Sequence, residues 1–210
     1  EIAPNITYEF YQAALKTGLK MDFEPGKKIT KSNSFAKLCD EIGLIVEDSS
    51  VGCKICDEFD SNKLGPAIKY IHGSKTIGTA CERLAKSATA IDSGLAFSTH
   101  VQEGEYFVIN PNFWQGPDLN PFVVTFVLAM SIKVIRVMSG DPDFAPKRIF
   151  LRVVLTEEAR KKTSEWFGCP VYGSAPYDAF VLDEDQWSIE NKNPGAYHDL
   201  PKRASPSMGQ

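Results

Sequence analysis

The stretches PKRIFLRVVL (146–155), TEEARKKTSEWFGCPV (156–171) and YDAFVLD (177–183) decide the fold of this chain. In the first stretch, apolar residues alternate with Arg148 and Arg152. This alternation has the two-residue period of a β-strand with one packed face and one partly wet face. The third stretch is predicted to be a second strand, so the segment between them must connect two strands.

The connecting segment predicts a short helix. Thr156 can accept a hydrogen bond at the helix N-terminus, and Glu157 and Glu158 suit the positive end of the helix dipole. Gly168 supplies a left-handed stop, and Pro170 prevents the helix from continuing. The residues predicted to share the inward face of this helix are Ala159, Thr163, Trp166 and Phe167.

The motif FGCPV (167–171), followed by a strand that ends in VLD (181–183), resembles the end of a known domain. This is the N-terminal effector-binding domain, of the arabinose-binding type, of AraC/XylS-family transcription regulators. A second motif stands where the order of the family's motifs requires it. LG (64–65) followed by TIGTAC (76–81) is similar to a Leu-Gly and a Thr-Leu-Gly-Glu-Ala-Leu-like helix of that family. The resemblance covers roughly residues 13–194 and is weakest before residue 50.

The resemblance implies a cytoplasmic, ligand-sensing regulatory domain without enzymatic activity. Such a domain binds a small-molecule effector, for example an amine, an amino acid, a fatty acid or a similar metabolite. It forms a homodimer and acts on DNA only through a C-terminal helix-turn-helix domain, which this chain lacks. Two departures, at 153–155 and at Gly173-Ser174, replace a His-x-x-Pro-like turn and an aromatic-Asn pair of the family. They bear on effector identity more than on fold.

The composition agrees with a regulatory domain that does not bind DNA by itself. The chain has 210 residues, of which 43% are hydrophobic, and its formal net charge is −4, so it lacks the positive surface that nucleic acid requires. Five cysteines without a preceding secretory leader favour reduced thiols and a cytoplasmic location. The longest apolar run, 122–132, is followed by Lys133 and Arg136, so no membrane segment is expected.

The first 90 residues predict a helical lobe. Apolar residues at helical spacing mark helices over 6–17, after Ser32 and over 51–59, the last capped by Ser49 or Ser50. The strongest amphipathic stripe, at positions i, i+3, i+4, i+7, i+8 and i+11, comprises Ile77, Ala80, Cys81, Leu84, Ala85 and Ala88.

The residues from 91 to 190 predict a sheet lobe. Residues 95–109 form a hairpin that turns at Glu103-Gly104-Glu105. Asn120 is expected to cap a helix over 121–138 that is apolar on almost every side and must therefore lie between two layers or at a subunit interface. The fold class is therefore α+β: a helical lobe packed on an antiparallel sheet of about five strands. Residues 1–190 form one effector-binding and dimerisation domain, and residues 191–210 a linker.

The sequence offers no catalytic, cofactor or metal site. Cys53 and Cys56 have the spacing of half a zinc site, but no second pair accompanies them, so two packed side chains on a helix are the favoured interpretation. Cys169 sits at a helix C-terminus, where the dipole disfavours a thiolate. Phosphate-binding loops, nucleophile elbows and calcium-binding triplets are absent from the sequence.

Aromatic residues supply the candidate ligand site, because a sensor of metabolites needs a mostly apolar pocket. We expect this pocket between the helical lobe and the sheet, and an acid near its rim would suit a cationic amine. The candidate lining residues are Phe107, Trp114, Phe122, Phe126, Tyr177 and Asp178.

Two alternatives come from other functional classes. A haem or gas sensor also combines a helical lobe with a sheet, but it needs an axial histidine on a helix and a Tyr-x-Ser-x-Arg clamp, which the sequence lacks. A ligand-free dimerisation module would explain the apolar helix without any pocket.

Overall fold

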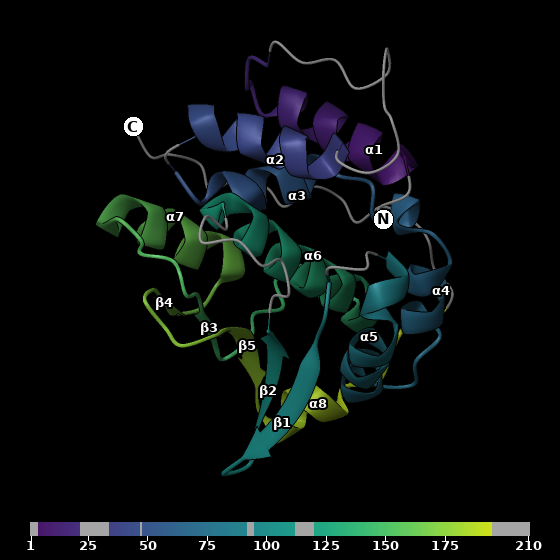
Figure 1. The fold of residues 1–210 in the computed structure, drawn as a ribbon. Helices are drawn as coiled ribbons and strands as arrows, with labels where there is room; N and C mark the ends of the chain where they lie inside the picture. The colour runs from purple at the N-terminus through teal and green to yellow at the C-terminus, as the bar shows by residue number, and fades with distance from the viewer. Residues whose placement is uncertain (1–3, 22–33, 47, 92–94, 112–119, 195–210) are drawn as a thin grey trace, which may run out of the picture.

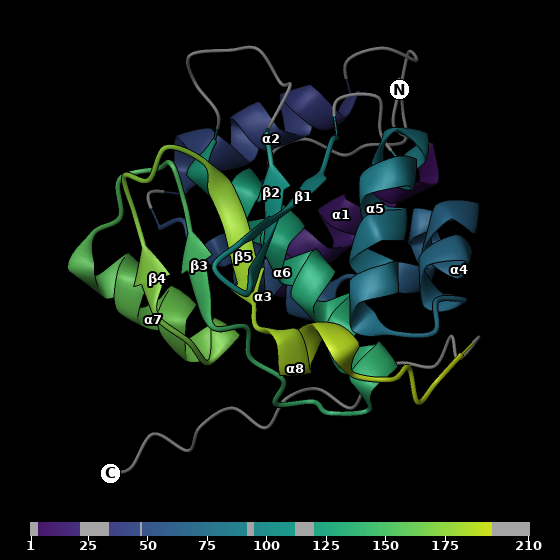
Figure 2. The same ribbon diagram turned by 90° about the horizontal axis from the view of Figure 1, so that it is seen from below.

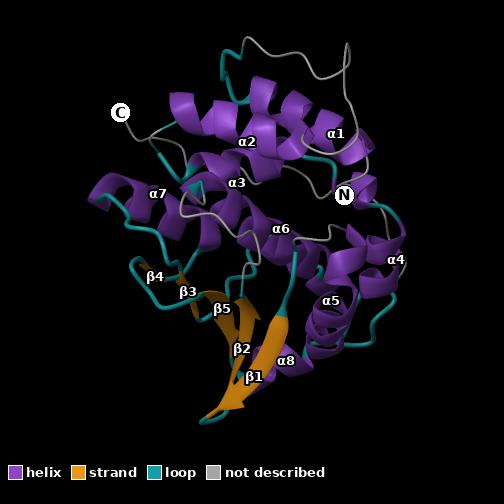
Figure 3. Ribbon diagram, in the orientation of Figure 1, coloured by secondary structure: helices purple, strands orange, loops and turns teal. Residues whose placement is uncertain are grey.

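The computed structural model describes residues 4–21, 34–46, 48–91, 95–111 and 120–194. Within these ranges the chain first forms helices and then alternates between strands and helices (Figures 1 and 3). The first half contains α1 (Pro4–Lys16), α2 (Ser34–Ile45), α3 (Val51–Glu58), a 3-10 turn (Ser61–Leu64), α4 (Pro66–His72) and α5 (Ile77–Ile91). The second half contains β1 (Ser98–Gln102), β2 (Glu105–Asn110), α6 (Pro121–Ser139), β3 (Arg148–Phe150), α7 (Glu157–Phe167), β4 (Val171–Tyr172), β5 (Asp178–Leu182) and α8 (Glu184–Ser188).

Helix α6 is the centre of the molecule. Helices α1 to α3 lie on one side of it, the sheet lies on the other, and α4 and α5 pack at one end (Figure 1). Among the described residues α6 alone has the length and hydropathy of a membrane span, yet 83% of that window is buried inside the fold. Of the two predicted positions, between two layers or at a subunit interface, the structure shows the first.

The sheet has five strands in the order β1-β2-β5-β3-β4, with β5 in the middle and in front of α6 when seen from below (Figure 2). The α+β class is confirmed, but the sheet is mixed, because β3 and β4 pair in parallel. The reason is the connection between them. Helix α7 returns the chain to the end of the sheet at which β3 begins, so β4 runs in the same direction as β3. All other pairs are antiparallel.

The predicted hairpin is confirmed as β1 and β2. Its turn consists of Glu103 and Gly104, which both have positive φ angles of 53° and 77°. Two successive left-handed residues are the geometry of a type I′ turn, whose twist matches that of the strands on either side.

The first predicted strand is shorter than expected, because β3 ends at Phe150. Leu151 still donates its N–H to the carbonyl of Tyr172, but the Arg152 N–H goes to the Asp178 carboxylate at 2.7 Å. The side-chain acceptor replaces a neighbouring strand at this point, so the ladder stops.

The two cations of α6 explain how a nearly all-apolar helix tolerates charge. The Lys133 ammonium donates to the carbonyls of Cys56 (2.8 Å) and Phe59 (2.8 Å) at the C-terminus of α3. Arg136 donates to the carbonyl of Trp166 (2.9 Å) at the end of α7 and lies 4.5 Å from the centre of the Trp166 ring. Each cation neutralises the negative end of a neighbouring helix and satisfies its last carbonyls.

The three predicted caps have different outcomes. Thr156 caps α7, since its hydroxyl accepts from the Ala159 N–H, and Gly168 ends that helix in the left-handed conformation. Ser50 and Asn120 stand at N-cap positions, but neither side chain makes a capping hydrogen bond. The Asn120 amide instead donates to the Cys39 carbonyl at 3.2 Å and so ties α6 to α2.

Two glycines allow helices to approach their neighbours closely. A Cβ atom on Gly52 would lie 2.2 Å from the Phe122 carbonyl oxygen, so α3 and α6 cross with their backbones almost in contact. A Cβ atom on Gly78 would lie 2.2 Å from the Trp187 indole nitrogen, which places α8 directly on the start of α5.

The first residues of the expected linker are bound to the domain. Asn191 donates to the carbonyls of His72 (2.7 Å) and Ser74 (2.8 Å), and the Lys192 N–H donates to the Met138 carbonyl. Asn193 donates to the Val137 carbonyl at 2.7 Å. The rest of the expected linker, 195–210, lies outside the described residues, and the division into lobes and linker stays a prediction.

Candidate functional site

A cavity of about 120 Å³ lies between the helical lobe and the sheet. Its walls come from α4 and α5 on one side, α6 on another, and β2 and β5 together with Leu95 and Phe97 on a third. Ile6 of α1 and Leu64 of the 3-10 turn complete the lining from the helical lobe. Elements that are distant in sequence therefore meet around one space, as expected for a ligand site.

Helices α5 and α6 form much of the cavity wall, and some of their side chains there are small. On α5 the predicted stripe turns Ala80, Cys81 and Leu84 toward the cavity. On α6 the residues Val127 and Ser131, one turn apart, face the same space.

The polar groups of the cavity wall are few. Asn110, at the end of β2, is 2% exposed, and Ser131 is 9% exposed. The Ser131 hydroxyl donates to the Val127 carbonyl at 3.1 Å, which leaves its oxygen lone pairs available as acceptors. Within the described part of the chain, no Asp, Glu, Lys, Arg or His side chain lines this cavity.

Of the residues predicted to line a pocket, Phe126 lies in the cavity wall. Its ring also makes an edge contact with Phe10, 4.7 Å between centroids, and another with Phe59 at 5.5 Å. Phe122 is one turn away and is buried in the same aromatic cluster, with its ring 6.3 Å from Phe10. Phe122 therefore supports the wall from behind.

The structure places Phe107 and Tyr177 on the opposite face of the sheet. Phe107 alternates with the buried Val108 and lies beneath Arg148, 5.9 Å from its guanidinium carbon. Tyr177 packs edge-on against Phe150 at 5.8 Å. These aromatic residues cover the outer surface of the sheet and are separated from the cavity by the sheet itself.

Asp178 is fully buried at the start of β5. One carboxylate oxygen accepts the Arg152 N–H and the other accepts the Arg152 Nε–H at 2.8 Å. This carboxylate therefore fixes the end of β3. Trp114, the remaining predicted residue, lies outside the described residues.

Sequence reasoning did not single out Asn110, Ser131 or Ala80 as site residues. A signal for Ser131 did exist, since it interrupts a run of larger apolar residues with a small polar one. Asn110 carried another signal, because an amide at the inward position of an apolar strand must be buried and hydrogen-bonded.

The cysteines form no metal site in the structure. All five are free and buried, and none of the described residues gathers three His, Cys, Asp or Glu side chains around one point. Cys56 directs its thiol at the Met130 sulfur, 3.4 Å away, and burial raises the pKa of this thiol to about 12.

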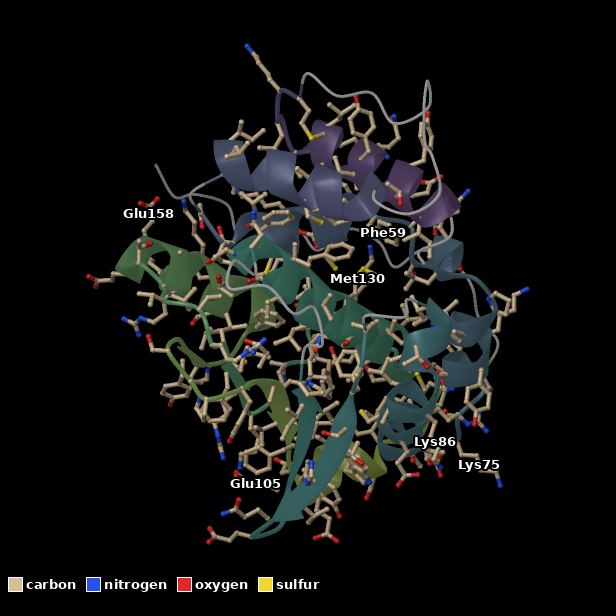
Figure 4. The ribbon with its side chains drawn as sticks, in the orientation of Figure 1. Phe59, Lys75, Lys86, Glu105, Met130 and Glu158 are labelled. Carbon is tan, nitrogen blue, oxygen red and sulfur yellow. The ribbon has the colours of Figure 1, made fainter. Side chains whose placement is uncertain are left out.

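Met130 and Phe59 both lie inside the molecule, whereas Lys75, Lys86, Glu105 and Glu158 lie at its periphery (Figure 4).

Comparison with known proteins identifies relatives of this architecture. Residues 28–189 match a protein-family model. The family is described as the arabinose-binding domain of AraC transcription regulator, N-terminal. The crystal structure of transcriptional regulator CdpR from Pseudomonas aeruginosa is similar with a TM-score of 0.66 at 15% identity, over 88% of this chain and 56% of that chain. At this identity the likeness shows the fold alone. No curated protein sequence matches the chain.

Proposed function

Because the chain belongs to the family of arabinose-binding N-terminal domains of AraC transcription regulators, we propose that its cavity binds a small organic effector. The domain is then a regulatory ligand-binding module, and both the family and the structural neighbour consist of transcription regulators rather than enzymes. In this proposal effector binding controls DNA binding by a separate C-terminal domain, and the protein acts as a cytoplasmic homodimer.

The observation that carries the proposal is the position of the cavity. A ligand there contacts α5, α6 and the sheet at once. Its binding energy therefore depends on how the helical lobe sits on the sheet, and a ligand shifts a conformational equilibrium only when it binds the two states differently. A cavity within one lobe would lack this dependence.

The segment after β5 offers a route from the cavity to the end of the domain. Trp187 of α8 stacks on Tyr106 of β2 at 4.3 Å and packs on Gly78 at the start of α5. The Ile77 N–H donates to the Ile189 carbonyl at 2.9 Å, and Asn191 binds carbonyls between α4 and α5. The same helix, α5, thus touches both the effector cavity and the segment that leaves the domain.

The proposal is tested by a thermal-shift screen of small metabolites with two matched variants of α5. Ala80→Leu adds three carbon atoms inside the cavity, whereas Ala90→Leu adds them on an exposed position of the same helix. A true effector at a hundred times its dissociation constant should stabilise the wild type by about 2.7 kcal/mol, a shift of a few degrees. The shift should remain in Ala90→Leu and disappear in Ala80→Leu.

Two results would contradict the proposal. One is a screen in which no compound stabilises the wild type. The other is a set of compounds that stabilise Ala80→Leu as much as the wild type, because such compounds bind elsewhere. Light scattering of the same sample tests the homodimer, which predicts about twice the mass of 23.2 kDa.

A further inference from the structure

Building on the proposed function, we infer that the effector is an uncharged, largely apolar molecule of about the size of a substituted benzene ring, with one neutral hydrogen-bonding group. The inference rests on three properties of the cavity: its volume, the chemistry of its wall, and the engagement of the neighbouring charges.

The volume limits the size of the effector. Drug-sized ligands occupy pockets of roughly 300–1,000 Å³, and an apolar protein cavity of about 150 Å³ accommodates benzene. The cavity between α5 and α6 measures about 120 Å³. It therefore suits a compact ligand and leaves no room for a long acyl chain unless the walls move.

The wall chemistry excludes a charged effector. An ammonium or carboxylate group that enters an apolar site without an opposite charge loses its hydration, at a cost larger than a single neutral hydrogen bond returns. Among the described residues, the wall is apolar apart from Asn110, Ser131 and the protonated thiol of Cys81. Burial raises the pKa of Cys81, so this thiol carries no charge at neutral pH.

Within the described residues, the charged side chains of α6 and β5 bind partners outside the cavity. On α6, Lys133 and Arg136 point at the C-termini of α3 and α7 and are held there by backbone carbonyls. Asp178 pairs in register with Asn110 in the sheet, so it is the acid closest to the wall along the strands. Both of its oxygens accept hydrogen bonds from Arg152, which gives a cationic ligand no counter-ion there.

The neutral polar groups define what the effector can present. The Ser131 hydroxyl has committed its proton to the Val127 carbonyl, so toward the cavity it can only accept. Asn110 carries an amide, which both donates and accepts. An alcohol or phenol hydroxyl on the effector matches the Ser131 oxygen, because it can donate a hydrogen bond to that oxygen.

The experiment uses four probes of nearly equal size: toluene, benzyl alcohol, benzylamine and benzoate. Their affinities for the intact protein are measured from thermal shifts at increasing concentration. We expect benzyl alcohol to bind best, toluene to bind more weakly, and the two charged probes to give no saturable shift. Ala80→Leu should abolish the shifts of both neutral probes because it fills the cavity.

A matched pair of variants tests the role of Ser131. Ser131→Ala should weaken the binding of benzyl alcohol by about two- to tenfold, which is the effect of losing one hydrogen bond, and leave the affinity for toluene unchanged. Ser87→Ala is the control, because Ser87 makes the same bond to the carbonyl four residues earlier on α5, at 2.8 Å, but does not line the cavity. Ser87→Ala should bind both neutral probes like the wild type.

The possible failures separate this inference from the proposed function. If benzylamine or benzoate binds and Ala80→Leu abolishes the binding, the cavity is an effector site but the inference of an uncharged effector is wrong. If no probe binds while a larger metabolite does so in an Ala80-dependent way, the inference on size is wrong and the proposed function stands. If neither the probes nor the metabolites bind, both are wrong.

Discussion

At the scale of single residues, burial decides what the chemical groups of this protein can do. Cys53 and Cys56 have the spacing of a metal-binding or redox pair, but α3 places both against other helices, without exposure to solvent. Burial raises the pKa of both thiols, to about 12 for Cys56. The interpretation of these residues as packed side chains came from the sequence alone, because no second pair of ligands follows them.

We predict that the thiols are inert in the folded protein. Reaction requires a thiolate with access to the reagent, and all five cysteines are buried. A disulfide reagent that reports free thiols should give little colour under native conditions and five equivalents after denaturation. Rapid reaction of two thiols in the native protein would contradict this account of α3.

A pH-dependence of stability is expected from His72. It is buried at the end of α4, and burial lowers its pKa. The unfolded chain therefore binds a proton more readily than the folded one as the pH falls through about 6.5, and the free energy of unfolding decreases in that range. The glutamine of the His72→Gln variant cannot be protonated. Its free energy of unfolding, measured by denaturant titration, should therefore decrease less between about pH 7 and pH 5.5 than that of the wild type.

The same experiment identifies a wrong assignment. If His72→Gln shows the same decrease over this range as the wild type, the proton uptake belongs to another group.

At the scale of elements, capping and crossing contacts hold the helices in place. The sequence indicated that α6 is buried, but it did not indicate that Lys133 caps α3, because the partners are 74 to 77 residues apart. Contacts between residues distant in the sequence also decide where the short strands end. The length of β3 is set by Asp178, 26 residues beyond Arg152, so alternation alone predicted a longer strand.

We predict that Lys133→Met destabilises the protein by about 1–3 kcal/mol, since buried carbonyls at the end of α3 lose a charged donor. The free energy of unfolding from urea titration measures the effect. Lys86→Met, on the exposed side of α5, is the matched control and should change stability by less than about 0.5 kcal/mol. Equal effects of the two substitutions would mean that the cap on α3 contributes nothing.

Two helical glycines make a second comparison at this scale. A Cβ on Gly52 meets the backbone of α6, with Phe126 N at 2.6 Å, whereas a Cβ on Gly43 meets only the side-chain amide of Asn120. Backbone cannot move aside as a side chain can. We therefore expect Gly52→Ala to cost about 1–3 kcal/mol in urea titrations in spite of its better helix propensity, and Gly43→Ala to cost less.

The reverse order would contradict the close crossing of α3 and α6. Gly52→Ala would then gain the advantage of alanine in a helix, about 1 kcal/mol, and raise the stability.

At the scale of the whole molecule, the sequence predicted the position of the cavity better than the residues that line it. A pocket between the helical lobe and the sheet was expected, and a cavity lies there. Of the five candidate residues that the structure describes, only Phe126 is part of its wall, because aromatic residues also build cluster contacts and the outer face of the sheet. Tertiary packing decides between these uses.

A cavity is also hard to predict from sequence, because it is a volume between packed elements that side chains leave unfilled. Ala80 and Ser131 create space only when α5 and α6 face each other at that level. Their positions in the sequence do not show that α5 and α6 face each other there, because the two residues are distant in the chain. The family motifs, in contrast, are local and were recognisable without the fold.

The most direct test of the central claim is a crystal structure of the protein soaked with the compound that gives the largest thermal shift. The account predicts electron density for that compound between α5 and α6, in contact with Phe126 and Ser131. Density on the outer face of the sheet beside Phe107 and Tyr177, with an empty space between α5 and α6, would contradict it.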